Sequence, residues 1–209
     1  MQVFTGLPIS QGLAAGTIVF LGAQEAAARQ AGSPQEEQAR FAAAQRQAVE
    51  ALGALYEKAK AELGEKDAEI FSVHQLMAED EDFTDLVSAA ISDGAEASEA
   101  VRQAGEQCAA MFSAMDDDYM RERAADVRDV SARICRVLNG EAEHTISAPC
   151  LIAAEELTPS QTVQFPRELV LGMLTARGAA NSHTGILART LGVPAVSQLP
   201  VSRELHGHT

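Results

Sequence analysis

His183 is the residue of this 209-residue chain whose surroundings best suit chemistry, and it follows a run of small residues that starts at Gly178. Three apolar residues then mark one face of a short helix: Ile186, Leu187 and Leu191. Gly192 suits the left-handed residue that ends a helix, and Pro194 keeps the helix from restarting. The sequence therefore predicts His183 at a helix N-terminus, where unpaired N–H groups and the helix dipole favour an anion. A histidine there is placed to carry a phosphoryl group, although an ordinary capping histidine has the same local pattern.

An α/β domain is expected to carry this helix, and its strands come from both ends of the chain. Four apolar runs have strand character: 17–21, 150–153, 170–174 and 193–196. Thr158, Pro159 and Gln161 have the pattern of a short helix start. We therefore expect a discontinuous α/β domain made of residues 1–30 and 143–209.

Residues 33–140 are expected to form a helical subdomain inserted between the two parts of that domain. Ser33, Pro34 and Glu36 supply the N-cap, the first position and the capping box of its first helix. Helical spacing of apolar residues predicts five helices with approximate ranges 34–64, 67–77, 80–91, 101–115 and 119–138. Because short connections join these helices, they should pack as an antiparallel bundle.

The composition is that of an ordinary globular protein, with 46% hydrophobic and 22% charged residues. A formal net charge of -14 would repel nucleic acid and favours a basic partner. Aromatic residues make up 4% of the chain and Trp is absent, which argues against base stacking. The first residues have no signal-peptide pattern, and no apolar run is long enough to span a bilayer. We therefore expect a cytoplasmic protein with no membrane insertion.

The spacing of cysteine and histidine predicts no metal site. The three cysteines, Cys108, Cys135 and Cys150, lie far apart and form no CxxC pair, so reduced thiols that act as small hydrophobic groups are expected. His206 and His208 lack a third candidate ligand at suitable spacing.

A second group of residues combines apolar side chains with consecutive acids. Leu76 and Met77 precede four acidic residues, and Phe83 follows them; the acids are Glu79, Asp80, Glu81 and Asp82. In one interpretation these acids stabilise the N-terminus of the next helix. In the other, an apolar patch rimmed by carboxylates binds a partner that has an apolar centre and a basic rim.

The His183 segment resembles the phosphohistidine signature of the PEP-utilising enzymes, Gly-Gly-x-x-Ser-His-x-x-Ile-x-Ala-Arg followed by Gly-Ile/Val-Pro-Ala. The matching residues are Gly178, Ser182, His183, Ile186, Ala188, Arg189, Gly192, Pro194 and Ala195. Ala179 replaces the second glycine, and Asn181 stands where threonine is common. If that glycine needs a positive φ, alanine costs about 1 kcal/mol and weakens loop closure.

Three other segments extend this resemblance over essentially the whole chain, to Enzyme I of the bacterial PEP:sugar phosphotransferase system. Residues 6–16 resemble its opening, 70–83 resemble the helical surface that docks its carrier protein HPr, and 119–130 match a further helix. The resemblance implies a swivelling phosphohistidine β/α domain with an inserted HPr-binding helical bundle. The C-terminal PEP-binding, dimer-forming barrel of the family is expected to be absent from this chain.

The resemblance also implies roles for individual residues. His183 is the phosphoryl acceptor, through its Nε2 atom. Thr162 is expected to hydrogen-bond that histidine, although it could instead be an ordinary helix hydroxyl. The residues expected to hold the phosphoryl group are Gly178, Ser182, Thr184 and Arg189, although Arg189 could instead brace the loop by pairing with an acid. The residues expected to contact HPr are His74, Leu76, Met77, Glu79, Asp80, Glu81, Asp82, Phe83 and Arg123.

The expected function is transfer of a phosphoryl group from phosphoenolpyruvate, through the absent C-terminal domain, to His183 and on to the active-site histidine of HPr. No cofactor is expected in this chain, and magnesium is expected in the C-terminal domain of the intact enzyme. Two alternatives stay open. One is the swivelling domain of a pyruvate,phosphate dikinase, a PEP synthase or a dihydroxyacetone-kinase phosphocarrier. The other is a module that docks HPr without transferring a phosphoryl group.

Overall fold

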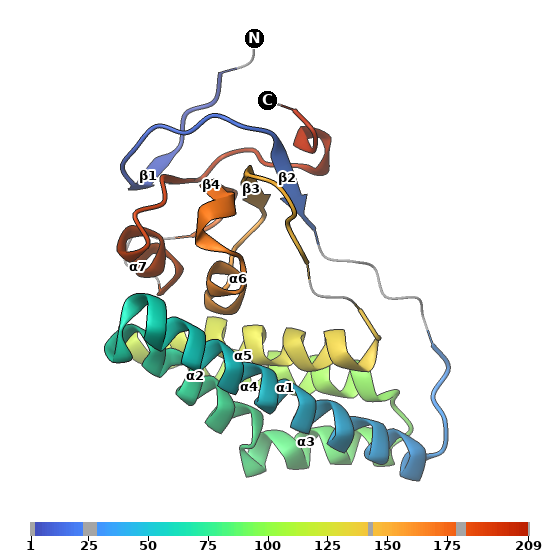
Figure 1. Cartoon of the computed structure of the whole chain (residues 1–209). Coiled ribbons are helices and arrows are strands. Elements are labelled where there is room, and N and C mark those ends of the chain that lie inside the picture. The colour runs from blue at the N-terminus through green and yellow to red at the C-terminus, as the bar shows by residue number, and fades with distance from the viewer. Residues whose placement is uncertain (1–2, 23–28, 142–143, 179–182, 209) are drawn as a thin grey trace. The chain divides into compact units, whose positions relative to one another are not determined.

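The computed structural model describes residues 3–22, 29–141, 144–178 and 183–208, without the side chains of five of them (118, 119, 122, 183 and 184). By its internal contacts the chain divides into two units (Figure 1). One unit comprises Met1–Ala23, Ala61–Asp67 and Glu143–Thr209, and the other comprises Gln24–Lys60 and Ala68–Ala142. The first is built around a mixed sheet and the second is helical, which confirms the prediction of a mixed α/β protein with a helical part.

The sheet of the α/β unit has five strands in the order β1-β5-β4-β3-β2. The strands are β1 (Leu7–Ser10), β2 (Ile18–Leu21), β3 (Cys150–Ala154), β4 (Val170–Thr175) and β5 (Ala195–Ser197). Strands β2, β3, β4 and β5 pair in parallel, and β1 pairs antiparallel with β5 at one edge. Because β4 and β5 are parallel neighbours, the helix between them is a crossover that returns the chain to the same end of the sheet.

Helices and one hydrophobic core complete the α/β unit. Its helices are α6 (Pro159–Gln164) and α7 (His183–Thr190), with two 3₁₀ turns, η1 (Arg167–Leu169) and η2 (Arg203–Leu205). The core residues come from every strand except β1 and from α7, and include Leu21, Ile152, Met173, Ala188 and Ala195. Burial of these side chains therefore holds α7 against the sheet.

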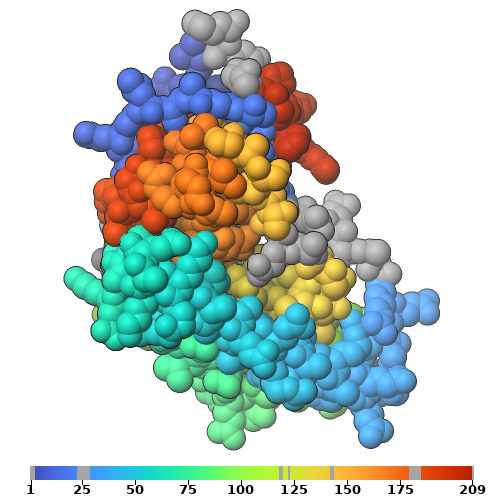
Figure 2. All heavy atoms as spheres, viewed as in Figure 1, coloured from blue at the N-terminus to red at the C-terminus, as the bar shows by residue number. Residues whose placement is uncertain are grey.

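The chain forms the five predicted helices, which lie in the helical unit except for the stretch Ala61–Asp67, where the first two helices join. They are α1 (Pro34–Leu63), α2 (Glu65–Ala78), α3 (Glu81–Ser92), α4 (Ala97–Ser113) and α5 (Asp118–Leu138). The second helix starts earlier than predicted, because Gly64, with a φ of 95°, is the whole connection between α1 and α2. Fully buried side chains such as Leu52, Phe71, Val101 and Ile134 form its core. The outer side chains of α1, light blue to cyan in Figure 2, form a continuous surface over one side of this unit.

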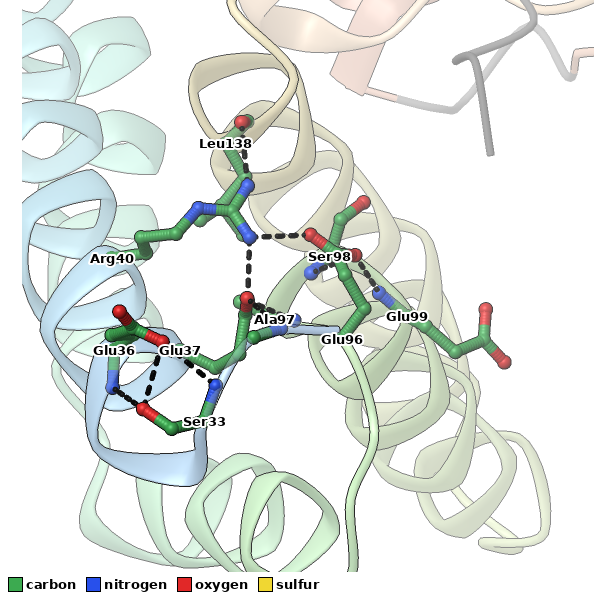
Figure 3. Close-up of polar contacts among 10 residues, drawn as sticks. Ser33, Glu36, Glu37, Arg40, Glu96, Ala97, Ser98, Glu99 and Leu138 are labelled. Carbon is green, nitrogen blue, oxygen red and sulfur yellow. Dashed lines mark hydrogen bonds and ion pairs between the residues drawn. The ribbon is translucent and has the colours of Figure 1, made fainter. Parts of the chain in front are cut away.

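Three helix ends of this unit meet at Arg40 (Figure 3). Its Nη1 atom pairs with Glu37 and lies 2.7 Å from Glu96 Oε1, and its Nη2 donates to the carbonyl of Leu138 at 3.2 Å. Glu37 also accepts from the N–H of Ala97 at 3.0 Å. The carboxylates lie at the N-termini of α1 and α4, and the guanidinium lies at the C-terminus of α5, so each charge complements a helix dipole.

The cysteines are free thiols, with Cys108 and Cys150 buried and Cys135 half-buried. Burial raises the pKa of all three, that of Cys135 to about 11. Protonated thiols are poor nucleophiles, so the prediction of inert, unpaired cysteines agrees with their environment. Among the described residues, no helix is both long and apolar enough to cross a membrane.

Candidate functional site

Helix α7 begins at His183, as the sequence predicts. The helix ends at a left-handed residue, as predicted, because Gly192 has a φ of 63°. The N–H of Gly192 donates to the carbonyl of Arg189 at 3.0 Å, and that of Val193 donates to the carbonyl of Ala188 at 2.9 Å. This pair of bonds is a Schellman motif. Val193 therefore belongs to the helix end, and the following strand starts two residues later than the sequence suggested.

The segment that leads into α7 leaves β4 and passes through Gly178, whose φ is 130°. The carbonyl of Gly178 accepts a hydrogen bond at 3.0 Å from the hydroxyl of Ser197, a buried residue of β5. Ala179, Asn181 and Ser182 lie outside the described residues, as do the side chains of His183 and Thr184. The expected cost of Ala179 and the phosphoryl-binding roles of Ser182 and Thr184 therefore stay predictions.

The buried face of α7 differs in one residue from the predicted face. Leu187 and Ala188 are buried and Leu191 packs against the core, but Ile186 is 37% exposed. Residues 187, 188 and 191 share a face because a helix turns about 100° per residue. Ile186 lies about 100° before Leu187, which turns it away from the sheet.

Arg189 lies on the exposed side of α7, and its Nη1 is 3.5 Å from the carbonyl oxygen of Ile9 in β1. This contact, at the limit of hydrogen-bond distance, is to a strand carbonyl, so the expected bracing of the loop by pairing with an acid stays a prediction. The phosphoryl-binding role of Arg189 stays a prediction.

Thr162 lies on α6, which packs against α7. A complete capping box starts α6, as predicted: Thr158 Oγ1 accepts from the N–H of Gln161, and the Gln161 side chain accepts from the N–H of Thr158. Thr162 is 2% exposed, and its hydroxyl donates to the carbonyl of Thr158 at 2.9 Å. Because this bond uses the hydroxyl proton, Thr162 Oγ1 has lone pairs that can accept from a further donor.

The acidic segment of the helical unit starts α3 and is also exposed. Asp80 is the N-cap of α3 and accepts from the N–H of Phe83 at 3.0 Å, which confirms the helix-start interpretation. The side chains of Glu79, Asp80, Glu81 and Asp82 are exposed. Leu76 is 69% exposed and Met77 is half-buried. An exposed leucine is therefore followed along the chain by four exposed carboxylates on this unit.

Three residues expected at the docking surface are buried instead: His74, Phe83 and Arg123. His74 Nε2 lies 3.3 Å from Asp126 Oδ1, and Arg123 Nη1 lies 2.8 Å from Asp126 Oδ2. The reason for His74 is helical geometry: Phe71, His74 and Ala78 share the buried face of α2, whereas Leu76 is on the exposed side. Burial corrects the expectation that these three side chains are exposed, and their role in docking stays a prediction.

Two methionines at the C-terminal end of α4 are also exposed. Met111 is 52% exposed and Met115 is 40% exposed. Met111 follows Cys108 on one face of α4, and Met115 comes just after the helix ends at Ser113. The pKa of the Cys108 thiol is raised by burial and further by the carboxylates of Asp80 and Asp82. Helix α4 packs against α3, the helix that the acidic segment starts. In the sequence, apolar residues at helical spacing continue to Met115, beyond the buried part of α4. This continuation is the signal that could have pointed to the two exposed methionines.

Among the residues that the structure describes, no group of three His, Cys, Asp or Glu is placed to hold a metal ion. His206 Nδ1 accepts from the N–H of Phe20 at 3.2 Å, so this nitrogen of the His206/His208 pair is occupied at the edge of the sheet.

Comparison with known families matches almost the whole chain. Residues 5–123 match the family described as PEP-utilising enzyme, N-terminal, and residues 146–207 match the family described as PEP-utilising enzyme, mobile domain. The chain belongs to the PEP-utilising enzymes.

Within that family, the chain is similar to the N-terminal part of Enzyme I. It is 41% identical over 164 residues to the phosphoenolpyruvate-protein phosphotransferase of Bacillus subtilis (strain 168), covering 77% of this chain and 29% of that protein. It is 38% identical over 200 residues to that of Bacillus sp. (strain S), covering 91% of this chain and 34% of the relative. The chain thus spans about a third of the length of these curated relatives.

Two solved structures have the same fold. The solution structure of Enzyme I (nEIt) superposes with a TM-score of 0.77 at 32% identity, covering 98% of this chain and 86% of that one. The N-terminal domain of Enzyme 1 - Nitrogen gives a TM-score of 0.70 at 24% identity, covering 98% and 87%, and supports the fold alone.

Proposed function

We propose that this chain is the phosphohistidine and carrier-docking part of an Enzyme I-type phosphotransferase. In this proposal His183 accepts a phosphoryl group that originates from phosphoenolpyruvate and passes it to the active-site histidine of HPr. The observation that carries the proposal is that His183 opens a helix in the segment matched to the mobile domain of PEP-utilising enzymes. The inserted five-helix unit favours Enzyme I over the dikinases and the dihydroxyacetone-kinase carriers.

The proposed chemistry is an in-line displacement at phosphorus. The lone pair of the neutral His183 Nε2 attacks phosphorus while the bond from phosphorus to the leaving atom breaks and its electrons stay with that atom. The leaving atom is the enolate oxygen of phosphoenolpyruvate, or a nitrogen of the HPr histidine in the reverse transfer. The N-terminus of α7, with Gly178, Ser182, Thr184 and Arg189, is proposed to hold the phosphoryl oxygens.

Thr162 is proposed to fix the tautomer of His183. If Thr162 Oγ1 accepts from the Nδ1–H of the imidazole, Nε2 keeps its lone pair for attack. The Thr162→Val variant should therefore accept the phosphoryl group roughly 100-fold more slowly, and Thr162→Ser should stay close to wild type. Rapid-quench measurement of single-turnover transfer from phosphorylated HPr checks this. Equal rates for the valine and serine variants would remove Thr162 from the mechanism.

The exposed surface of Leu76, Met111, Met115 and the acids 79–82 is proposed as the docking site for HPr. Truncating a central apolar side chain, in Leu76→Ala or Met111→Ala, should weaken HPr binding by about 1–2 kcal/mol, roughly tenfold. Isothermal titration calorimetry measures this loss. The matched control is Leu13→Ala, which truncates a fully exposed leucine of the α/β unit and should leave the affinity unchanged. A loss in the control as large as in Leu76→Ala would place the docking site elsewhere.

The swivelling role of the α/β unit and the supply of phosphoryl groups are also part of the proposal. In the intact enzyme this unit would alternate between HPr and a PEP-binding C-terminal part, which would also hold the magnesium ion. We also propose that the reaction takes place in the cytoplasm. Incubating the chain separately with phosphorylated HPr and with phosphoenolpyruvate tests the division of roles: only phosphorylated HPr should label it. Labelling by phosphoenolpyruvate alone would contradict it.

A further inference from the structure

Arg167, at the start of η1, contacts the far end of the helix that begins at His183. Its Nε donates to the carbonyl of Leu191 at 2.6 Å, and its Nη2 donates to the carbonyl of Gly192 at 3.2 Å. Its Nη1 donates to the carbonyl of Val170, the first residue of β4, at 3.3 Å. One guanidinium thus joins the end of α7 to the start of the strand that precedes it.

The carbonyls of Leu191 and Gly192, at the end of α7, are groups that the helix itself leaves unpaired. The Schellman motif uses the carbonyls of Ala188 and Arg189 for the N–H groups that follow. The carbonyls of Leu191 and Gly192 come after them, and the fork of a guanidinium can bind both at once. Its positive charge also lies at the negative end of the helix dipole. Arg167 therefore completes the C-terminal cap of α7.

Ser197 holds the other end of the same segment. Its buried hydroxyl donates to the carbonyl of Gly178, where the chain leaves β4 towards His183. The backbone just before this point is also fixed, because the N–H of Arg177 donates to the carbonyl of Glu155 at 2.8 Å. The His183 segment therefore lies between two side-chain anchors, one in β5 and one in η1.

We propose that Arg167 and Ser197 are positioning residues that hold His183 for phosphoryl transfer, an inference that rests on the proposed function. An eight-residue helix has few hydrogen bonds of its own, so contacts at its ends help to set where it lies. Transfer between two imidazoles depends on that position, since a misplacement of about 1 Å can slow a reaction roughly 100-fold. Neither residue touches the reacting atoms in this proposal.

The test of Arg167 compares Arg167→Ala, Arg167→Lys and the control Arg203→Ala. Arg203 is an exposed arginine of η2 in the same unit, and no side-chain hydrogen bond is seen for it among the described residues. Arg167→Ala should lower the single-turnover rate of transfer from phosphorylated HPr about tenfold or more, with unchanged HPr affinity. Arg167→Lys should restore part of the rate, because an ammonium group can donate to one or two of these carbonyls. Arg203→Ala should transfer at the wild-type rate.

The test of Ser197 uses Ser197→Ala with Ser202→Ala as its control, since Ser202 is exposed and makes no side-chain cap bond to η2. Ser197→Ala should slow transfer several-fold at unchanged HPr affinity, and Ser202→Ala should not. Wild-type rates for Arg167→Ala and Ser197→Ala would overturn the proposal. A second result would also overturn it. In that result Arg167→Lys does not restore the rate, and the unfolded fraction of Arg167→Ala, measured by circular dichroism, accounts for all of its loss of rate.

Amide hydrogen exchange separates this inference from the proposed function. In Arg167→Ala, exchange of the amides at 191–193 should become faster while amides of the helical unit keep wild-type rates. A wild-type chain that accepts no phosphoryl group would overturn the proposed function, and with it the role of Arg167 and Ser197 in transfer. Unchanged exchange at 191–193 would show that Arg167 does not hold α7, whatever the activity.

Discussion

Replacing His183 by alanine should abolish phosphoryl transfer from phosphorylated HPr and leave HPr binding unchanged. The methyl group of alanine has no lone pair to attack phosphorus, and no other described residue takes that role in the proposal. The proposed docking surface is on the helical unit, so its affinity should not depend on this side chain. Transfer is measured with radiolabelled phosphoryl groups, and affinity is measured by calorimetry.

The control for this experiment is His208→Ala in the same unit. His208 is exposed, and its backbone carbonyl, which alanine retains, accepts from the N–H of Ile18 at 2.8 Å. This variant should be labelled like the wild type. If His183→Ala is labelled at the wild-type rate, the phosphoryl acceptor is another residue and the assignment of His183 is wrong.

Replacing Glu37 by alanine should cost the helical unit about 3 kcal/mol of unfolding free energy. Glu37 is 1% exposed, and it accepts from the N–H groups of Gly32 and Ala97 while it pairs with Arg40. Its loss leaves a part-buried guanidinium with one carboxylate fewer and leaves two helix-terminal N–H groups without an acceptor. Urea unfolding followed by far-UV circular dichroism measures this loss, because the five helices dominate that signal.

The matched control is the neighbouring Glu36→Ala, which removes only an exposed capping-box carboxylate that accepts from Ser33 at 2.8 Å. Its effect should be clearly smaller. Equal losses for the two variants would mean that the charge cluster around Arg40 does not stabilise the helical unit beyond ordinary capping.

The Glu37 effect should also depend on pH in a defined direction. Burial alone would raise the pKa of Glu37, but the Gly32 and Ala97 N–H groups and Arg40 outweigh burial and lower the pKa below its ordinary value of 4.5. A carboxyl with a lowered folded pKa stabilises the fold above its unfolded pKa and loses that contribution as pH falls through the folded pKa. The stability difference between wild type and Glu37→Ala should therefore be largest above pH 4.5 and shrink in more acidic solution. A difference that grows on acidification would contradict this assignment.

Local chemistry made much of the fold predictable from the sequence. The capping boxes at Ser33 and Thr158 are signals that act within four residues, and the structure contains both. Gly192 and Pro194 marked the end of α7 in the same way. Each of these residues fixes the backbone next to it, so no knowledge of distant neighbours was needed.

Features that depend on distant neighbours were not predictable in this way. Helical spacing within α2 could not show that Asp126 and Asp129 of α5 lie next to His74. Strand β1 is short, and its role depends on pairing with β5 near the other end of the chain. The contacts of Arg167 join it to carbonyls 24 and 25 residues away, and a carbonyl acceptor leaves no mark in the residue types.

Incubating the chain with phosphorylated HPr and measuring its intact mass shows whether it carries a phosphoryl group. We expect a gain of one phosphoryl group that is labile in acid and stable in base, and that peptide mapping locates on His183. A chain that gains no phosphoryl group but still binds HPr would be a docking module without transfer. That result, or a phosphoryl group located on any other residue, would contradict the proposed function.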